Sequence, residues 1–309
     1  MNTSVKLGKL KLKNPVTVAS GTFGYAQEFK DLVDLDALGA IITKTITLNP
    51  RMGNPTPRIA ETSSGMLNAI GLQNEGLDNF INIKLPLLQK IKTKIIVSVS
   101  ANSAEEFIHC ARALEKAKVE AVELNLSCPN IKYVKLKSSK GKAKIFAQDE
   151  TDTFTLVNAV AKKTNLVLIA KLSPNVTDIT RIALAAQKAG AQAVSLVNTF
   201  SAMAIDINTR KPRLANINGG LSGPAIKPIA IKMVYDVANA VDIPVLGMGG
   251  IMNAADAIEF ILAGATAISV GTANFVNPRA SMEIIKGIEQ YCANNKLKNI
   301  NQLIGMVSI

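Results

Sequence analysis

Short apolar runs rich in Val, Ile and Leu recur along the chain, separated by longer stretches with a helical pattern. Such nearly continuous runs are typical of strands that are buried on both faces, as in a parallel sheet. We predict strands at residues 15–20, 40–44, 94–100, 120–126, 166–172, 191–197, 243–249 and 266–271.

Several of the intervening stretches carry helix signals. Ser103 followed by Glu106 has the spacing of a capping box, and residues 177–190 begin with a Thr cap and end in a glycine. Strands that alternate with helices form a parallel sheet covered by helices, and eight such units in 309 residues fit a (β/α)8 TIM barrel. We therefore predict one domain, 1–309, with helices at residues 103–118, 177–190, 253–265 and 278–292.

The first residues and the first turn bear on the details of this fold. Residues 5–15 resemble a β-hairpin ahead of the first barrel strand, and we expect it to plug the bottom of the barrel. The alternative fold is a doubly wound open sheet, which requires a glycine-rich turn and a helix directly after the first strand. Residues 19–29 match that requirement only loosely, so we favour the barrel.

Composition narrows the class of protein. Hydrophobic residues make up 48% of the chain, which allows a large core, whereas aromatic residues make up 4% and Trp is absent. Few aromatic rings argue against a stacking platform for single-stranded nucleic acid. No apolar run reaches the ~18 residues of a membrane span, and residues 1–21 lack the features of a signal peptide. We expect a cytoplasmic protein, and we attribute the net charge of +12 to solvated lysines rather than to a nucleic-acid partner.

The cysteines and the single histidine limit metal and redox chemistry. Cys110, Cys128 and Cys292 are widely spaced and odd in number, which argues against a disulfide framework. Three thiols cannot fill the four positions of an ordinary iron–sulfur cluster. His109 is the only histidine, so no site can use a histidine pair, and we expect no metal site.

Polar residues gather where the predicted strands end. In TIM-barrel enzymes the carboxyl ends of the strands carry the active site. We therefore predict one polar cavity at this end of the barrel, formed by Ser20, Gly21, Thr22, Lys44, Thr45, Ser98, Ser100, Asn125, Ser127, Cys128, Lys171, Asn198, Thr199, Gly249, Gly250, Gly271 and Thr272.

Three features of this predicted cavity indicate its ligands. Glycines follow the seventh and eighth strands, where many barrels bind a phosphate through backbone N–H groups. Lys44 and Lys171 end apolar strands, which suggests an anionic or electron-rich ligand or, alternatively, a Schiff-base lysine. The amide-rich residues 68–76 lie in a long segment between two strands, and long loops in compact domains are usually functional.

Together these segments identify a family resemblance. The chain resembles the class 1 dihydroorotate dehydrogenases, and most closely the catalytic subunit of the NAD-linked class 1B enzymes. The resemblance extends over nearly the whole chain and is carried by the order of "ASGTFGY" (19–25), "KTIT" (44–47), "NAIGLQN" (68–74), "ELNLSCPN" (123–130), "AKLSPNV" (170–176), "VNT" (197–199), "GGLSGPAIKP" (219–228), "GMGGI" (247–251) and "VGTANF" (270–275).

The resemblance implies a specific activity and set of partners. The chain would oxidise (S)-dihydroorotate to orotate in de novo pyrimidine (UMP) biosynthesis, with FMN as its cofactor. It would form a homodimer within a heterotetramer, whose other subunit carries FAD and a 2Fe-2S cluster and passes electrons to NAD. Neither nucleic acid nor membrane is an expected partner.

The resemblance also implies roles for individual residues, and Cys128 would be the catalytic base. Residues Ser20, Gly21, Lys44, Thr45, Ser98, Asn125, Lys171, Val197, Gly223, Gly249, Gly250, Gly271 and Thr272 would bind FMN. Residues Lys44, Asn68, Ala69, Ile70, Gly71, Leu72, Asn125, Asn198 and Thr199 would bind the substrate.

The implied chemistry is physically reasonable for these residue types. Cys128 would take the C5 proton from one face of the substrate while a hydride passes from C6 to FMN on the other face. A thiol, whose ordinary pKa is about 8.5, can serve as this base if nearby positive charge favours the thiolate. Amides such as those of Asn68, Asn125 and Asn198 match the N–H and C=O groups of a pyrimidine.

The chain departs from the family pattern at two places. Ser98 stands where the family more often has an asparagine that contacts FMN, so that contact would be lost or bridged by water. Residues 131–150 replace a short glycine-rich stretch, and we expect them to form a mobile cover with altered gating. This segment carries Lys132, Lys135, Lys137, Lys140, Lys142 and Lys144.

Two related activities are the alternatives. One is a stand-alone class 1A dihydroorotate dehydrogenase that reduces fumarate. The other is an FMN-dependent tRNA dihydrouridine synthase, which the net charge of +12 would suit. We expect no helical RNA-binding domain to follow the predicted barrel, which argues against the synthase. A class 2 enzyme would have an N-terminal membrane-associating domain and a serine base, neither of which we expect here.

Overall fold

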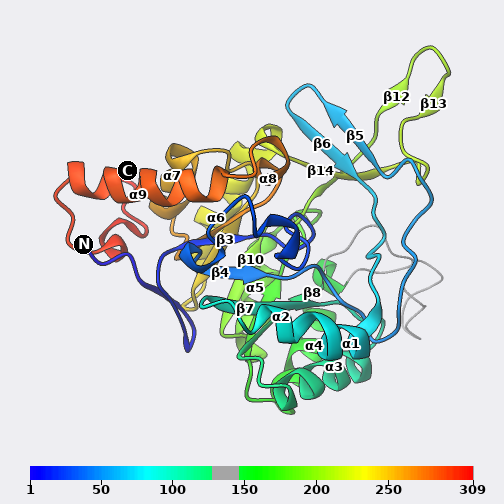
Figure 1. The fold of residues 1–309 in the computed structure, drawn as a ribbon, viewed down its shortest axis with the longest axis horizontal. Helices are drawn as coiled ribbons and strands as arrows, with labels where there is room; N and C mark the ends of the chain where they lie inside the picture. Colours follow the sequence, from blue (N-terminus) through cyan, green and yellow to red (C-terminus); the bar gives the residue numbers. More distant parts are fainter. Residues whose placement is uncertain (127–145, 309) are drawn as a thin grey trace.

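In a computed structural model, which describes residues 1–126 and 146–308, eight parallel strands close into a barrel (Figure 1). Each strand pairs with the next one along the chain, and the last pairs with the first. This closure confirms the predicted (β/α)8 barrel and excludes the open sheet. The strands are β3 (Val16–Val18), β4 (Ala40–Ile42), β7 (Lys94–Val99), β8 (Ala121–Asn125), β9 (Val167–Lys171), β10 (Ala193–Leu196), β15 (Val245–Met248) and β16 (Ala267–Val270).

Each of the predicted strand segments contains one of these strands. All residues of β8 and β9 are buried, including the charged side chains Glu123 and Lys171. The continuous apolar runs therefore indicated strands that are covered on the outside by helices and filled on the inside by side chains.

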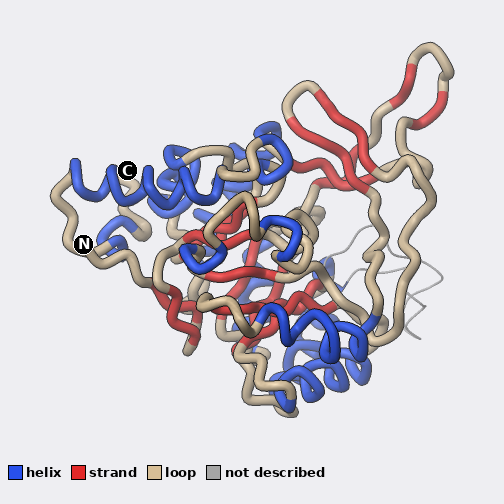
Figure 2. Tube along the Cα trace, viewed as in Figure 1, coloured by secondary structure: helices blue, strands red, loops and turns tan. Residues whose placement is uncertain are grey.

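Helices surround the barrel strands, as the tube in Figure 2 shows. Their inward faces are apolar; in α3, for example, the buried side chains of Phe107, Cys110 and Leu114 recur at helical spacing. The four predicted helices are α3, α5, α7 and α9, and all four are confirmed. The helices are α1 (Gly76–Asn79), π-helical Phe80–Lys84, α2 (Leu85–Leu88), α3 (Ala104–Lys116), α4 (Glu150–Ala161), α5 (Ile179–Lys188), α6 (Lys227–Ala240), α7 (Ala254–Leu262), α8 (Ala273–Val276) and α9 (Ala280–Asn294).

The predicted capping box of α3 is only half formed. The Ser103 hydroxyl accepts the backbone N–H of Glu106, as expected. The Glu106 carboxylate, however, accepts from the backbone and side-chain N–H groups of Asn102 instead of returning to Ser103. The loop before the helix therefore takes the acceptor that a full box would use.

The predicted Thr cap of α5 is wrong. The cap residue is Asp178, whose carboxylate accepts the backbone N–H of Thr180 at 2.9 Å. Asp is a strong N-cap because its acceptor carries charge, and here it displaces the preceding threonine by one position. The terminal Gly190 is confirmed as the residue after the helix, with φ of +102°.

The predicted N-terminal hairpin is present and lies at the amino-terminal ends of the barrel strands. It pairs β1 (Val5–Leu7) with β2 (Leu10–Leu12). Gly8 lies against Gln192, just before β10, and the Lys13 ammonium donates to the backbone carbonyl of Lys92, just before β7. The hairpin thus covers the end of the barrel opposite the predicted site.

A second sheet, which the sequence analysis did not predict, lies beyond the carboxyl-terminal ends of the barrel strands (Figure 1, upper right). It joins two insertions that are far apart in sequence. Its strands, in spatial order, are β11 (Phe200–Ala202), β14 (Gly219–Ser222), β6 (Gly65–Asn68) and β5 (Ile59–Thr62); nearby, β12 (Ile205–Asp206) pairs with β13 (Lys211–Pro212).

The first and last parts of the described chain meet. The backbone N–H of Asn2 donates to the carbonyl of Lys298, and the N–H of Ile300 donates to the carbonyl of Asn2, both at 3.0 Å. Asn2 and Asn299 form a parallel β-bridge. No helix within the described residues has the length and apolar character needed to cross a membrane.

Candidate functional site

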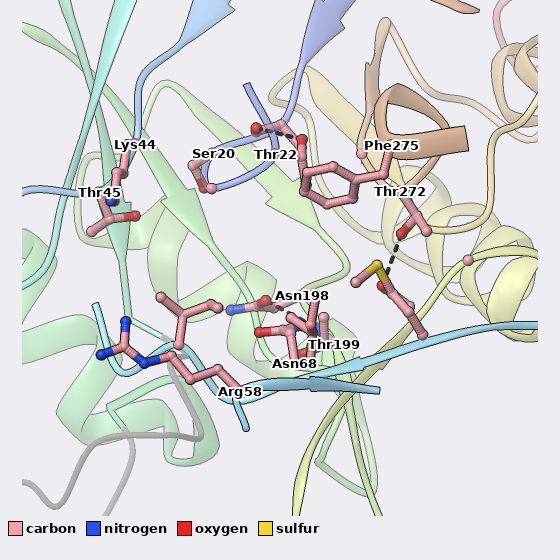
Figure 3. A pocket seen from close by; sticks show the side chains of 18 of the residues that line it. Ser20, Thr22, Lys44, Thr45, Arg58, Asn68, Asn198, Thr199, Thr272 and Phe275 are labelled. Atoms are coloured by element: carbon pink, nitrogen blue, oxygen red, sulfur yellow. Dashed lines mark hydrogen bonds between the residues drawn. The ribbon is translucent and has the colours of Figure 1, made fainter. Parts of the chain in front are cut away.

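A cavity of about 1740 Å³ opens where the barrel strands end and the second sheet begins. Figure 3 shows Lys44 and Thr45 on one side of it and Asn68, Asn198 and Thr199 on another. The predicted site residues that line it are Ser20, Gly21, Thr22, Lys44, Thr45, Asn68, Ile70, Gly71, Leu72, Asn125, Lys171, Val197, Asn198, Thr199, Gly223, Gly249, Gly250, Gly271 and Thr272.

Three predicted site residues in the described part of the chain do not line this cavity. One is Ser100, whose buried hydroxyl donates to the backbone carbonyl of Asn125 at 3.3 Å. Ser98 is fully buried, and its hydroxyl is held by the side chains of Thr45 and Glu123. The Ala69 methyl group is buried in a small apolar cluster under the second sheet. Cys128 and most of the lysine-rich segment 131–150 lie outside the described residues.

The predicted phosphate site has the backbone geometry that an anion requires. Gly223, Gly249 and Gly250 have φ of +98°, +124° and +86°, a region that side chains disfavour. A Cβ atom at Gly250 would lie 2.8 Å from the carbonyl oxygen of Gly223. Within the described residues, no hydrogen bond uses the backbone N–H of Gly250, Gly271 or Thr272. These donors can therefore bind a phosphate.

A group of charged side chains fixes the loop that carries these glycines. The Asp256 carboxylate accepts the backbone N–H groups of Met252 and Asn253 at the start of α7. The Lys227 ammonium, at the start of α6, donates to Asp256 at 2.7 Å and to Glu259 at 2.8 Å. These hydrogen bonds raise the pKa of Lys227. The two helix starts are thus held together beside the predicted phosphate site.

Two lysines bring positive charge to the cavity in different settings. Lys171 is buried; its ammonium lies 3.0 Å from the Ser20 hydroxyl and 3.5 Å from the Glu123 carboxylate. Lys44 is partly buried, and none of the ion pairs in the described part of the chain includes it. Lys44 is therefore the better candidate for a direct charge contact with an anionic ligand.

The predicted amides come from three separate elements and converge on the cavity. Asn68 of β6 donates to the carbonyl of Gly220 at 3.2 Å, which joins the two insertions. The side-chain oxygen of Asn198 accepts the backbone N–H of Thr199 at 2.9 Å. Asn125 donates to the Thr45 hydroxyl at 3.3 Å. Each amide is thus oriented by the protein.

A chain of hydroxyl groups connects Asn125 with the barrel interior. The Thr45 and Ser98 hydroxyls lie 2.9 Å apart, and Ser98 donates to Glu123 at 3.1 Å. Because a carboxylate only accepts, Ser98 must donate to it, Thr45 then donates to Ser98, and Asn125 donates to Thr45. The carboxylate therefore fixes the direction of the whole chain.

Several functional candidates were missed by sequence reasoning. Tyr25 lines the cavity, and burial, followed by the charges of Glu75 and Glu28, raises its pKa to about 12, so its phenol stays a hydrogen-bond donor. Ser269 also lines the cavity, and its buried hydroxyl has no partner within the described residues. Neither residue stands out in the sequence.

Glu123, by contrast, did carry a signal that was overlooked. It is a charged residue inside the apolar run 120–126, just as Lys171 is inside 166–172. A buried charge is rare unless it is paired. The two charges could therefore have been predicted to pair, since they lie on adjacent strands of a parallel barrel.

The two cysteines that the structure describes are packing residues. Cys110 of α3 and Cys292 of α9 belong to the hydrophobic core of the protein and are fully buried. Burial raises the pKa of Cys110 to about 12, and it also raises the pKa of Cys292. Neither thiol is suited to act as a base near neutral pH.

Comparison with known proteins gives consistent matches over the whole chain. Residues 2–292 match the family described as dihydroorotate dehydrogenase. Similar relatives bear the name dihydroorotate dehydrogenase B (NAD(+)), catalytic subunit. The protein from Desulforamulus reducens is 53% identical over 306 residues, 99% of this chain and 98% of the relative. Those from Geotalea daltonii and Caldicellulosiruptor bescii are 51% identical (99% of this chain, 98% of the relative) and 49% identical (100% of both).

Proposed function

This chain belongs to the dihydroorotate dehydrogenase family, and on that premise we propose that it oxidises dihydroorotate to orotate in pyrimidine biosynthesis, as the catalytic subunit of a class 1B enzyme. The main support for the proposal is that the glycines of the predicted phosphate site, the two lysines and the three asparagine amides all line one cavity. This combination provides separate places for a phosphorylated cofactor and for a small anionic pyrimidine.

The cofactor we propose is FMN, a flavin that ends in one phosphate. The protein fits such a group, because unused backbone N–H groups and positive-φ glycines form an anion site at the strand ends. Gly223, Gly249, Gly250, Gly271 and Thr272 would hold the phosphate. Ser20, Lys171 and Val197 would line the remainder of the cofactor site. When bound, FMN supplies the two-electron acceptor for the reaction.

The residues proposed for the substrate site would bind its carboxylate, bind its ring and remove its C5 proton. Lys44 faces the cavity without an ion-pair partner in the described part of the chain and would bind the substrate carboxylate. Asn68, Asn125 and Asn198 would bind the N–H and C=O groups of the ring. Cys128 would take the C5 proton as the general base.

The names of the relatives support a further subunit. They call those proteins catalytic subunits and include NAD(+). We therefore assign to this chain a homodimeric core that works in a heterotetramer, in which the second subunit carries FAD and a 2Fe-2S cluster and passes electrons to NAD. Thr199 and the residues Ile70, Gly71 and Leu72 would complete the substrate side of each catalytic chain.

The cofactor is tested by loading the purified chain with FMN and adding dihydroorotate without oxygen. We expect the flavin absorbance to bleach on addition of dihydroorotate. A chain that cannot be loaded with FMN, or a loaded chain that stays coloured, would contradict the proposal. The Cys128→Ala variant should keep FMN yet lose at least ~100-fold in bleaching rate, the usual contribution of a general base; Cys110→Ala serves as the matched control.

The partner subunit is tested by copurification and by identifying the electron acceptor. We expect the chain to copurify with an iron- and FAD-containing subunit, and the complex to reduce NAD. A lone homodimer that turns over with fumarate would instead assign it to class 1A.

A further inference from the structure

A carboxylate lies deep inside the barrel, below the cavity. Glu123 is 0% exposed, and the strand register places it beside Ser98 of β7 and Ile169 of β9. Removing a carboxylate from water has a large free-energy cost unless it is paired and hydrogen-bonded. A buried glutamate at this position therefore requires partners that compensate its charge.

Glu123 has such partners on three other strands. Ser98 donates to one carboxylate oxygen at 3.1 Å, and Ser195 of β10 donates to the other at 3.0 Å. The ammonium of Lys171 lies 3.5 Å from the first oxygen. Both oxygens are therefore engaged, and the carboxylate is held in one orientation.

Lys171 connects this interior group with the cavity. Its ammonium contacts Glu123 on the interior side and the Ser20 hydroxyl on the cavity side, and the residue lines the cavity. Only 5% of its side chain is exposed. The lysine is thus one half of a buried ion pair whose positive end faces the proposed cofactor site.

We propose that Glu123 is a positioning residue that sets the charge at the floor of the cavity: it fixes the Lys171 ammonium beside the cofactor and offsets most of its field there. Reduction adds negative charge to a flavin, so an uncompensated cation beside the ring favours the reduced form. Glu123 therefore holds the reduction potential of the bound flavin below the value that Lys171 alone would give. This inference rests on the proposed function, because it requires FMN in the cavity.

The principal test replaces the charged carboxylate of Glu123 with a neutral amide of the same shape. Glu123→Gln is prepared in the full chain and loaded with FMN, and the midpoint potential is measured against a reference dye. We expect a more positive potential than in the wild type, and a shifted flavin absorbance spectrum. Glu120→Gln is the matched control: it removes a carboxylate three residues earlier, from a side chain that is 57% exposed and paired with Lys94. Its potential should equal that of the wild type.

Glu123→Asp provides a second variant, which keeps the charge but retracts it from Lys171 by one methylene. We expect its potential to lie between those of the wild type and Glu123→Gln. If Glu123→Gln does not fold or load, Glu123→Asp decides: a potential above that of the wild type supports the inference, and an unchanged potential overturns it. A folded, loaded Glu123→Gln with the potential of Glu120→Gln overturns it directly. Failure of the wild-type chain to bind FMN is a separate result and contradicts the proposed function itself.

Discussion

The hydroxyl of Ser98 illustrates how a residue outside a cavity can control one inside it. It donates to Glu123 and lies 2.9 Å from the Thr45 hydroxyl, which in turn accepts from Asn125. An asparagine at this position could reach a ligand directly, whereas this serine is too short and is fully buried. Its effect on the cavity therefore passes through hydrogen-bond direction rather than through contact.

Ser98→Ala should weaken orotate binding. Without the hydroxyl, Thr45 is no longer forced to accept from Asn125, and the amide loses its fixed orientation. We expect a loss of about tenfold in orotate affinity, close to the contribution of one hydrogen bond. Titration of the flavin absorbance with orotate measures this affinity. Ser281→Ala, which removes another buried hydroxyl from α9, is the control and should leave orotate affinity unchanged.

Tyr25 predicts a dependence of stability on pH. Its pKa is raised from 10.0 to about 12 in the folded chain. Below pH 10 the phenol is protonated in both states, whereas between pH 10 and 12 only the unfolded chain releases the proton. The free energy of unfolding therefore falls as pH rises through this window.

Tyr25→Phe should accordingly lose less stability than the wild type between pH 9.5 and about 11.5, because the titrating phenol is gone. The midpoint of thermal unfolding, recorded across this range, measures the difference. Tyr291→Phe removes a phenol from α9 and should follow the wild-type curve. If both variants follow the wild type, Tyr25 does not titrate as expected.

The sequence predicted the polar residues at the strand ends that line the cavity, but it did not predict the whole lining or how its members are arranged. Lys44, Lys171 and Asn125 could be predicted because each interrupts an apolar run at a strand end. Tyr25 and Ser269 could not, because a tyrosine in a loop and a serine in a strand are common anywhere. Their importance depends on burial and on missing partners, which only the folded chain defines.

Among the elements, the loops after β15 and β16 carry the proposed anion site, and a substitution at Gly250 tests this proposal. With φ of +86° and the Gly223 carbonyl 2.8 Å from an added Cβ, Gly250→Ala should both strain and displace this loop. We expect FMN affinity to fall by at least ~10-fold, since the backbone donors must remain aligned with the phosphate. Fluorescence of released FMN gives the affinity.

Gly305→Ala is a control that separates the effect of backbone strain from the effect of the clash at Gly250. Gly305 has φ of +72°, and an added Cβ would meet nothing within 4 Å. This variant should lose stability from strain alone and keep FMN affinity. Equal FMN affinities in the two variants would show that the Gly250 loop does not bind the phosphate.

Elements were predictable where one periodicity dominates. The barrel strands and α3, α5, α7 and α9 have apolar patterns of sufficient length. The second sheet does not. Its strands β5 and β6 have four residues each, with one buried position among exposed or partly buried ones, and β6 pairs with β14, more than 130 residues further along the chain. Pairing between distant insertions leaves no local pattern, so sequence reasoning identified residues 68–76 only as a functional loop.

For the whole molecule, we expect the stability of the barrel to depend on the hairpin of β1 and β2, which covers the amino-terminal ends of the barrel strands. Leu12 is fully buried there, whereas its neighbour Lys11 is exposed. Leu12→Ala should lower the free energy of unfolding by about 2–5 kcal/mol, because it leaves a void in the core. Lys11→Ala should change it by no more than about 0.5 kcal/mol. Urea denaturation of both variants measures these values; equal stabilities would show that the hairpin does not support the barrel.

The architecture as a whole was predictable from the sequence, because eight apolar runs alternating with helices have few other solutions. Cap positions were less predictable. Asp178 caps α5 in place of the preceding threonine, and Asn102 takes the Glu106 carboxylate that a full capping box of α3 would use. Such competition depends on the exact path of a loop, which a linear pattern does not specify.

The contact between Asn2 and Asn299 also indicates that the chain would tolerate circular permutation. Asn2 and Asn299 lie near the two ends of the described chain and are in contact, so we expect that a peptide linker could join these ends and that new ends could be opened in the exposed turn between β12 and β13. Such a circular permutant would retain every strand pair of the barrel. The pairing of the strands in the closed barrel is therefore separable from their order along the chain.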